Sequence, residues 1–169
     1  MAGPKLRLHK RSVVAWTGAE SDLPPLFEAD EGEINVGRIR NGLRGWLAIG
    51  NEAREVQQPL REDRLTIRVL PGPHETPIQT IECEVTPQLN RVGIRLRPLT
   101  PLPIKAPADL PSCGMQFGTI QLHPDDSLVA MGPDHPITGG YLQPLTVLWE
   151  ERWKLAQLTP GERVIFRVD

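Results

Sequence analysis

Cysteine is scarce in this sequence of 169 residues. Cys83 and Cys113 are the only two, and they form neither a CxxC pair nor part of a His/Cys cluster at zinc-ligand spacing. A disulfide framework needs several cysteines in a small secreted domain, and a structural zinc site needs closely spaced ligands. The sequence therefore predicts neither, and a reducing, cytoplasmic setting fits it best.

Long apolar runs are absent as well. Nowhere do about eighteen apolar residues follow one another, as a membrane-spanning helix would require. The opening segment "MAGPKLRLHKRSVVAW" carries basic residues but lacks the apolar run of a secretory signal peptide. The sequence therefore disfavours both membrane insertion and secretion.

An excess of positive charge is also missing, since the formal net charge is −2 and the charged residues are scattered. A nucleic-acid-binding surface would show as a clustered basic excess. In "RVGIRLRPL", Arg91, Arg95 and Arg97 alternate with apolar residues. This pattern favours a half-buried strand with arginine on its polar face over a phosphate-binding surface, so we expect no nucleic-acid partner.

Proline and glycine, by contrast, are abundant, with 18 and 15 residues. They separate short apolar runs, many of which alternate apolar and polar residues as half-buried strands do. The strands expected on this basis span residues 12–17, 33–39, 45–50, 65–70, 81–86, 92–97, 118–122, 127–131, 144–148 and 163–168. The sequence therefore predicts an all-β, mainly antiparallel barrel or sandwich.

One segment, "LWEERWKLAQL", has helical periodicity instead. Its apolar residues recur at i, i+3 and i, i+4 spacings, two glutamates lie near its start, and a Pro-Gly pair follows it. We expect one short helix over about residues 149–158. The positions of Trp149 and Trp153 favour covering an open end of a barrel over stacking on a ligand.

Two polar or proline-rich stretches divide the chain. The polar segment 51–63 lies between two expected strands and predicts a seam between a small N-terminal part and a larger C-terminal part. The region 97–118 is longer than most connections in a compact domain. Loops of that length are usually functional, mobile or extended along a surface.

Four pieces of the sequence, in order, resemble a known family: "VVAWTGAESD", "IRVLPGP" with "NRVGIRL" after it, "GTIQLHPDD", and "DHPITGGY" followed by "WKLAQLTPGERVIFRV". They resemble the second-subunit family of allophanate hydrolase. This family of biotin-dependent carboxyltransferase domains includes the C subunit of bacterial 5-oxoprolinase, the KipI antagonist and part of urea amidolyase. The resemblance is loose over residues 10–50 and good over residues 65–169.

The resemblance implies a cyclophilin-like β-barrel domain over residues 61–169, a truncated N-terminal β subdomain over residues 1–60, and partnership with a first-subunit protein. Family members are typically much longer, so the chain is expected to start near the middle of the first domain. Two signatures are edited: the usual "IQVPPDG" is "IQLHPDD" at residues 120–126, and the usual "QTTGGYP" is "PITGGYL" at residues 136–142. The edits leave it open whether such a chain is catalytically active.

The resemblance also implies carboxyl transfer from carboxybiotin to an amide nitrogen, which needs hydrogen-bond donors for a carboxylate and an oxyanion, and a proton acceptor. Gly139 and Gly140 would allow backbone N–H groups close to a ligand, and Thr138 and Tyr141 would orient substrate through their hydroxyls. The same residues also suit a plain strand–turn–strand with glycines at positive φ. The sequence leaves the two interpretations nearly even.

Four further residues complete the candidate substrate-binding site. Gln121 would offer an amide and Asp134 a carboxylate, and Asn90 with Arg91 would recognise an anion. No catalytic residue is assigned.

Other chemistry has less support in the sequence. His123 and His135 each lie near aspartates, but such pairs on loops are usually solvated, and no metal site is predicted. Ser112-Cys113 lies in an expected loop without a histidine at a defining spacing, so a cysteine–histidine dyad is not expected. The phosphate-binding patterns GxxxxGK[ST] and GxGxxG are absent, and no lysine lies in a biotin-attachment motif. We expect no tightly bound cofactor, with carboxybiotin, if used, carried by a partner protein.

The leading hypothesis is a compact carboxyltransferase second subunit. With a first-subunit partner it would form part of an ATP- and biotin-dependent carboxyltransferase or hydrolase acting on 5-oxoproline, urea or an allophanate-like amide. One alternative is a non-catalytic regulatory protein of the KipI-antagonist type, which should expose an apolar patch. Another is a small-molecule binding barrel, and self-association into a homo-oligomer is the other partnership considered.

Overall fold

The computed structural model describes residues 5–18, 21–24, 26–38, 45–50, 65–107 and 109–169. The chain divides into two compact units, Met1–Leu60 and Arg61–Asp169, each of which is described by itself. The seam expected over residues 51–63 lies outside the described residues. No helix among the described residues is long and apolar enough to cross a membrane.

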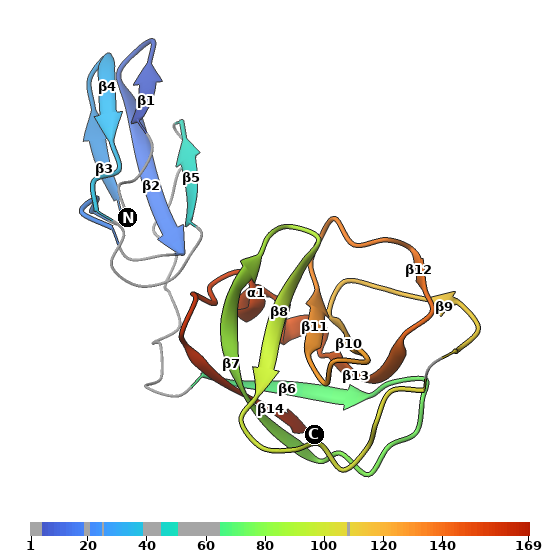
Figure 1. Ribbon diagram of the computed structural model, residues 1–169. Helices are drawn as coiled ribbons and strands as arrows, with labels where there is room; N and C mark the ends of the chain where they lie inside the picture. The colour runs from blue at the N-terminus through green and yellow to red at the C-terminus, as the bar shows by residue number, and fades with distance from the viewer. Residues whose placement is uncertain (1–4, 19–20, 25, 39–44, 51–64, 108) are drawn as a thin grey trace. The chain divides into compact units, whose positions relative to one another are not determined.

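The first unit consists of short antiparallel strands (Figure 1). One pair joins β1 (Lys5–Leu8) to β4 (Gly32–Asn35), and a three-stranded sheet has the order β3 (Leu26–Ala29), β2 (Ser12–Gly18), β5 (Gly45–Ile49). Its small core is centred on Leu8, Val14 and Ile34. The expected strand over residues 33–39 ends early, at Asn35, because Gly37 has a positive φ of 77° that interrupts an extended chain.

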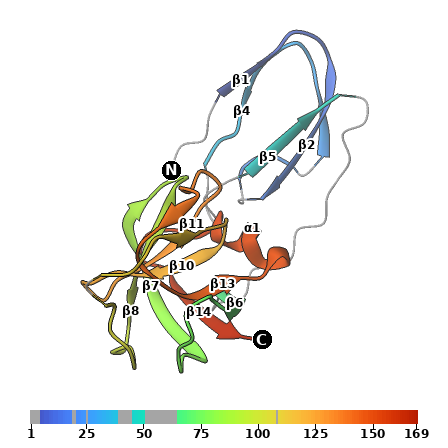
Figure 2. The same ribbon diagram turned by 90° about the vertical axis from the view of Figure 1, so that its right-hand side faces the viewer.

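The second unit is a closed barrel in which only β14 and β6 pair in parallel (Figures 1 and 2). A separate two-stranded sheet joins β9 (Cys113–Gly114) to β12 (Thr138–Gly139). The barrel strands, in their order around it, are β10 (Thr119–Leu122), β11 (Leu128–Met131), β8 (Gly93–Pro98), β7 (Thr80–Leu89), β14 (Arg163–Val168), β6 (Leu65–Pro71) and β13 (Leu142–Val147). This architecture confirms the predicted all-β, mainly antiparallel, cyclophilin-like barrel.

Alternation along the strands builds the barrel core. On β7, Ile81, Cys83 and Val85 are all buried while the residues between them are half-buried, as the sequence predicted. On β14, Val164 and Phe166 are fully buried in the same cluster. Burial raises the pKa of the Cys83 thiol to about 12, with a smaller contribution from the Glu82 carboxylate.

The helical segment is shorter than the sequence predicted. A 3₁₀ turn, η1 (Trp149–Glu151), leads into α1 (Arg152–Leu155), and the helix ends three residues before the expected limit at 158. The prediction that Trp149 and Trp153 cover an end of the barrel is wrong, since they are 74% and 41% exposed. Leu155 and Leu158 enter the barrel core instead.

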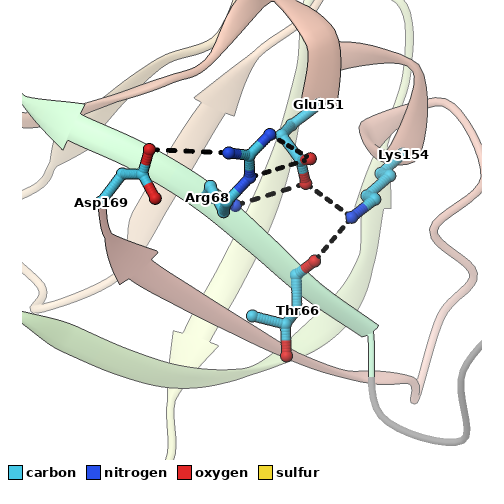
Figure 3. A network of polar contacts seen from close by, with 5 residues as sticks. All are labelled: Thr66, Arg68, Glu151, Lys154 and Asp169. Atoms are coloured by element: carbon cyan, nitrogen blue, oxygen red, sulfur yellow. Dashed lines mark hydrogen bonds and ion pairs between the residues drawn. The ribbon is translucent and has the colours of Figure 1, made fainter.

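A polar network holds this segment to β6 (Figure 3). The Glu151 carboxylate accepts hydrogen bonds from Arg68 Nη2 at 3.2 Å and from Lys154 Nζ at 2.5 Å, and Lys154 Nζ also donates to the Thr66 carbonyl at 2.9 Å. Arg68 Nη1 lies 3.5 Å from the Asp169 carboxylate. Burial alone would raise the pKa of Glu151, but the bonds from Lys154 and Arg68 outweigh it and lower the pKa.

The long region 97–118 runs over the barrel surface. Between β8 and β9 its described residues form neither helix nor strand. Leu102, Ile104 and Ala106 are partly buried against the barrel core. This segment thus fits one of the uses expected for a long loop, extension along a surface.

Candidate functional site

Two glutamines occupy buried positions on the outer face of neighbouring strands β10 and β13. Ile120 and Leu122 point into the barrel core, so Gln121 between them faces outward. Gln121 is 3% exposed and Gln143 is 1% exposed. The pairing of β10 with β13 shifts register between Ile120 and Leu122, opposite Gln143.

In both buried side chains, the amide nitrogen donates its hydrogen bond to a sulfur atom. Gln121 Nε2 donates to Met115 Sδ at 2.9 Å, and Gln143 Nε2 donates to Cys113 Sγ at 3.0 Å. Thiol and thioether sulfurs accept hydrogen bonds weakly. A buried amide with a weak acceptor gains by meeting a stronger hydrogen-bond partner, which makes these two side chains candidates for contact with a polar ligand.

Close packing disfavours a side chain at Gly139 and, less strongly, at Gly140. A Cβ on Gly139 would lie 2.7 Å from Gln121 Nε2 and 2.9 Å from Met115 Sδ. A Cβ on Gly140 would lie 3.2 Å from the Leu110 carbonyl oxygen. Gly139 ends β12, and Gly140 with Tyr141 connects it to β13, so the segment is a strand, a short connection and a strand. Neither glycine has the positive φ that the turn interpretation expected. Thr138 pairs with Gly114 on β9, and its side chain is exposed.

Tyr141 stacks on a histidine that the site prediction did not include. The rings of Tyr141 and His123 lie 4.1 Å apart between centroids, at an interplanar angle of 26°. Tyr141 is 43% exposed, whereas His123 Nε2 is buried and has no hydrogen-bond partner. We call Gln121, His123, Tyr141 and Gln143 the outer-face cluster. The sequence signal for His123 was its place two residues after Gln121, directly past the end of β10.

The turn after β10 adds charged groups beside His123. Asp125 accepts hydrogen bonds from Ser127 Oγ at 2.6 Å and from Arg95 Nη2 at 2.8 Å. The hydrogen bond from the Ser127 hydroxyl is the main cause that lowers the pKa of Asp125. Burial lowers the pKa of His123, Arg95 lowers it further, and Asp125 opposes them. The lowered pKa favours the neutral form of the His123 imidazole.

The other three predicted residues form a second group at the turn between β7 and β8. Arg91 and Asp134 form an exposed ion pair, with Nη2 donating to Oδ1 at 2.8 Å, and this bond raises the pKa of Arg91. Asn90 Oδ1 accepts from the backbone N–H groups of Val92 at 2.8 Å and Gly93 at 3.2 Å. Asn90 thus stabilises the turn, and anion recognition by Arg91 would require its ion pair with Asp134 to open.

A groove of about 840 Å³ lies over the same barrel, within the size range of small-molecule sites. Its walls are residues 86–88, 95–102, 104–105 and 125–127. None of the eight predicted site residues lines it, but residues 125–127 form the turn that follows His123. Within the described part of the chain, no group of three or more His, Cys, Asp or Glu side chains is placed to hold a metal ion.

Comparison with known proteins gives consistent matches. A family model described as carboxyltransferase domain, subdomain A and B, matches residues 50–168. The C subunit of 5-oxoprolinase from Escherichia coli (strain K12) is 29% identical over 191 aligned positions, which cover 98% of this chain and 60% of that protein. The crystal structure of TTHA0988 has a TM-score of 0.81 at 24% identity, covering 98% of this chain and 44% of that chain. The crystal structure of Kluyveromyces lactis urea carboxylase has a TM-score of 0.76 at 21% identity. This match covers 98% of this chain and 22% of that chain.

The two structural matches, at less than 25% identity, establish the fold. The chain spans only part of each protein that it matches. The family model, however, extends over more than half of the chain and includes the outer-face cluster and the barrel that carries it. The chain therefore belongs to the carboxyltransferase domain family, subdomain A and B.

Proposed function

We propose that this chain is the carboxyltransferase part of an ATP- and biotin-dependent enzyme that processes an amide such as 5-oxoproline, urea or an allophanate-like compound. The observation that carries the proposal is the pair of buried amides, Gln121 and Gln143, with sulfur acceptors on the outer face of the barrel. Family membership and the likeness to the C subunit of 5-oxoprolinase support the same class of reaction.

The residues present suit both reactants of a carboxyl transfer. The ureido ring of biotin and an amide substrate each present N–H donors and a carbonyl acceptor, which primary amide side chains complement. Carboxybiotin, when bound, would supply the activated carboxyl group. Gln121 and Gln143 would bind and orient the reactants. Gly139 lies against the Gln121 amide, and because it has no side chain it would let a reactant approach that amide closely.

In this proposal, the remaining parts of the reaction come from partner proteins. The sequence has no phosphate-binding loop of the known patterns and no biotin-attachment lysine motif. We therefore propose that the chain works with a first-subunit protein and a biotin-carrying protein, which would activate bicarbonate with ATP. The groove beside the outer-face cluster is a candidate entry for the biotin arm of such a carrier.

Reconstitution with those partners tests the proposal. The tagged full chain would be purified from its host, and the co-purifying biotin-containing and first-subunit proteins would be identified by mass spectrometry and produced with it. We expect ATP hydrolysis that depends on 5-oxoproline, urea or allophanate and that falls strongly in Gln121→Leu. The matched control Val129→Leu changes the residue paired with Gln121 on β11 and should keep the activity.

Two outcomes would contradict the proposal. The first is a reconstituted complex in which none of the three amides stimulates ATP hydrolysis. The second is a chain that co-purifies only with a regulatory protein or with itself, which would favour the regulatory or small-molecule binding alternatives.

A further inference from the structure

His123 has a buried polar atom that the fold leaves without a partner. Its Nε2 is closed to solvent and makes no hydrogen bond, and among the described residues it is the one buried side-chain nitrogen or oxygen in this state. Leaving such an atom unpaired destabilises the folded state, because the atom loses its hydrogen bonds to water and gains none in the protein. Native proteins rarely retain an unpaired buried polar group without a reason such as a bound ligand or a catalytic role.

The backbone places this imidazole at the predicted site. β10 pairs with β13 so that Leu122 lies opposite Leu142, with both side chains packed in the barrel core. The residues next to this pair, His123 and Tyr141, therefore lie together on the outer face, where their rings stack. Gln121 lies two residues before His123, on the same face.

The state of the imidazole suits an amide ligand. A neutral imidazole has one donor and one acceptor nitrogen. The charged groups that act on it, Arg95 from β8 and Asp125 from the following turn, have opposite signs and already bind each other. Nε2 can therefore bind a carbonyl or an N–H group of an uncharged amide without a net charge beside it.

We propose that His123 is a ligand-contacting residue of the outer-face cluster, with Nε2 binding an amide group of the ligand and the Tyr141 ring covering the imidazole until the ligand arrives. The inference deepens the proposed function, on which it rests, by naming a binding residue of this chain's own. The Tyr141 side chain is half-exposed and therefore less enclosed by neighbours than Gln121 and Gln143, which are almost fully buried.

The test observes the imidazole directly. The sequence has four histidines, so the ¹⁵N signals of His123 in the full chain can be assigned by comparison with His123→Gln. The probes are 5-oxoproline, urea and biotin, each added separately. We expect at least one probe to shift the Nε2 signal of His123. His123→Leu should weaken that probe roughly tenfold, the value of one good hydrogen bond, and His123→Gln should recover part of the loss.

The matched control is His135→Leu, which removes a histidine outside the cluster and should bind the probe as the unsubstituted chain does. Unchanged backbone amide spectra verify that each variant is folded. The inference is overturned if no probe shifts the His123 signal, or if His123→Leu binds as tightly as His135→Leu. A probe that shifts the side-chain amides of Gln121 and Gln143 but not His123 refutes this inference alone. A shift at His123 without amide-dependent ATP hydrolysis in the reconstituted complex refutes the proposed function alone.

Discussion

Replacing Gly139 by alanine should disturb the outer-face cluster without unfolding the barrel. The new Cβ would lie 2.7 Å from Gln121 Nε2 and 2.9 Å from Met115 Sδ. Non-bonded heavy atoms prefer about 3.5–4.0 Å, so the Gln121 amide must move by about 1 Å. Overpacking a well-filled site costs about 1–3 kcal/mol, and the lower end applies here because both contacted atoms end flexible side chains.

The same displacement should weaken ligand binding. If Gln121 loses one hydrogen bond of about 1 kcal/mol to the ligand, affinity falls roughly fivefold. Stability would be measured by guanidinium chloride unfolding followed on barrel amide signals, and affinity by titration with biotin and 5-oxoproline.

Gly114→Ala is the matched control for this prediction. Gly114 pairs with Thr138, the neighbour of Gly139, yet a Cβ there meets nothing within 4 Å and its φ is not positive. We expect Gly114→Ala to keep wild-type stability and affinity. If Gly139→Ala equals Gly114→Ala in both measurements, close packing does not select glycine at position 139.

Three further predictions concern the rest of the barrel. Glu151→Gln should lower the free energy of unfolding by about 1–3 kcal/mol at pH 7. Because the folded pKa of Glu151 is lowered, this difference should be present above pH 4.5 and vanish as the pH falls through the folded pKa. Cys83 should resist thiol reagents in the folded chain. Because its pKa is raised from 9.0 to about 12, stability should fall more steeply as pH rises through that window in the wild type than in Cys83→Ala. Leu158→Ala should cost about 2–5 kcal/mol in denaturant unfolding, whereas Trp149→Ala should change stability little, and equal costs would contradict the packing described above.

Strand alternation made much of the barrel predictable from the sequence. Period-two burial marks β7 and β14 because one face of each strand lies in a continuous core. The two-residue strands β9 and β12 were not predicted, since pairs of that length exist only through the tertiary contacts around them. Likewise β1 and β3 were missed because at most one of their residues is fully buried.

The candidate site could be predicted only in part, because its contacts also depend on tertiary structure. The signature identified Gly139, but its role depends on Met115 and Gln121, which reach it only after β9 and β12 pair. The contact between His123 and Tyr141 follows from the register of β10 against β13, which local sequence does not encode.

The buried amides of the outer-face cluster are the centre of the proposed ligand site. The most direct test is a titration of the ¹⁵N-labelled full chain with biotin and with 5-oxoproline, following the side-chain amide signals of Gln121 and Gln143. We predict that both signals shift along one binding curve, and that the curve weakens in Gly139→Ala. Shifts confined to groove residues such as Leu102 and Lys105, with both glutamine signals unmoved, would contradict this assignment of the ligand site.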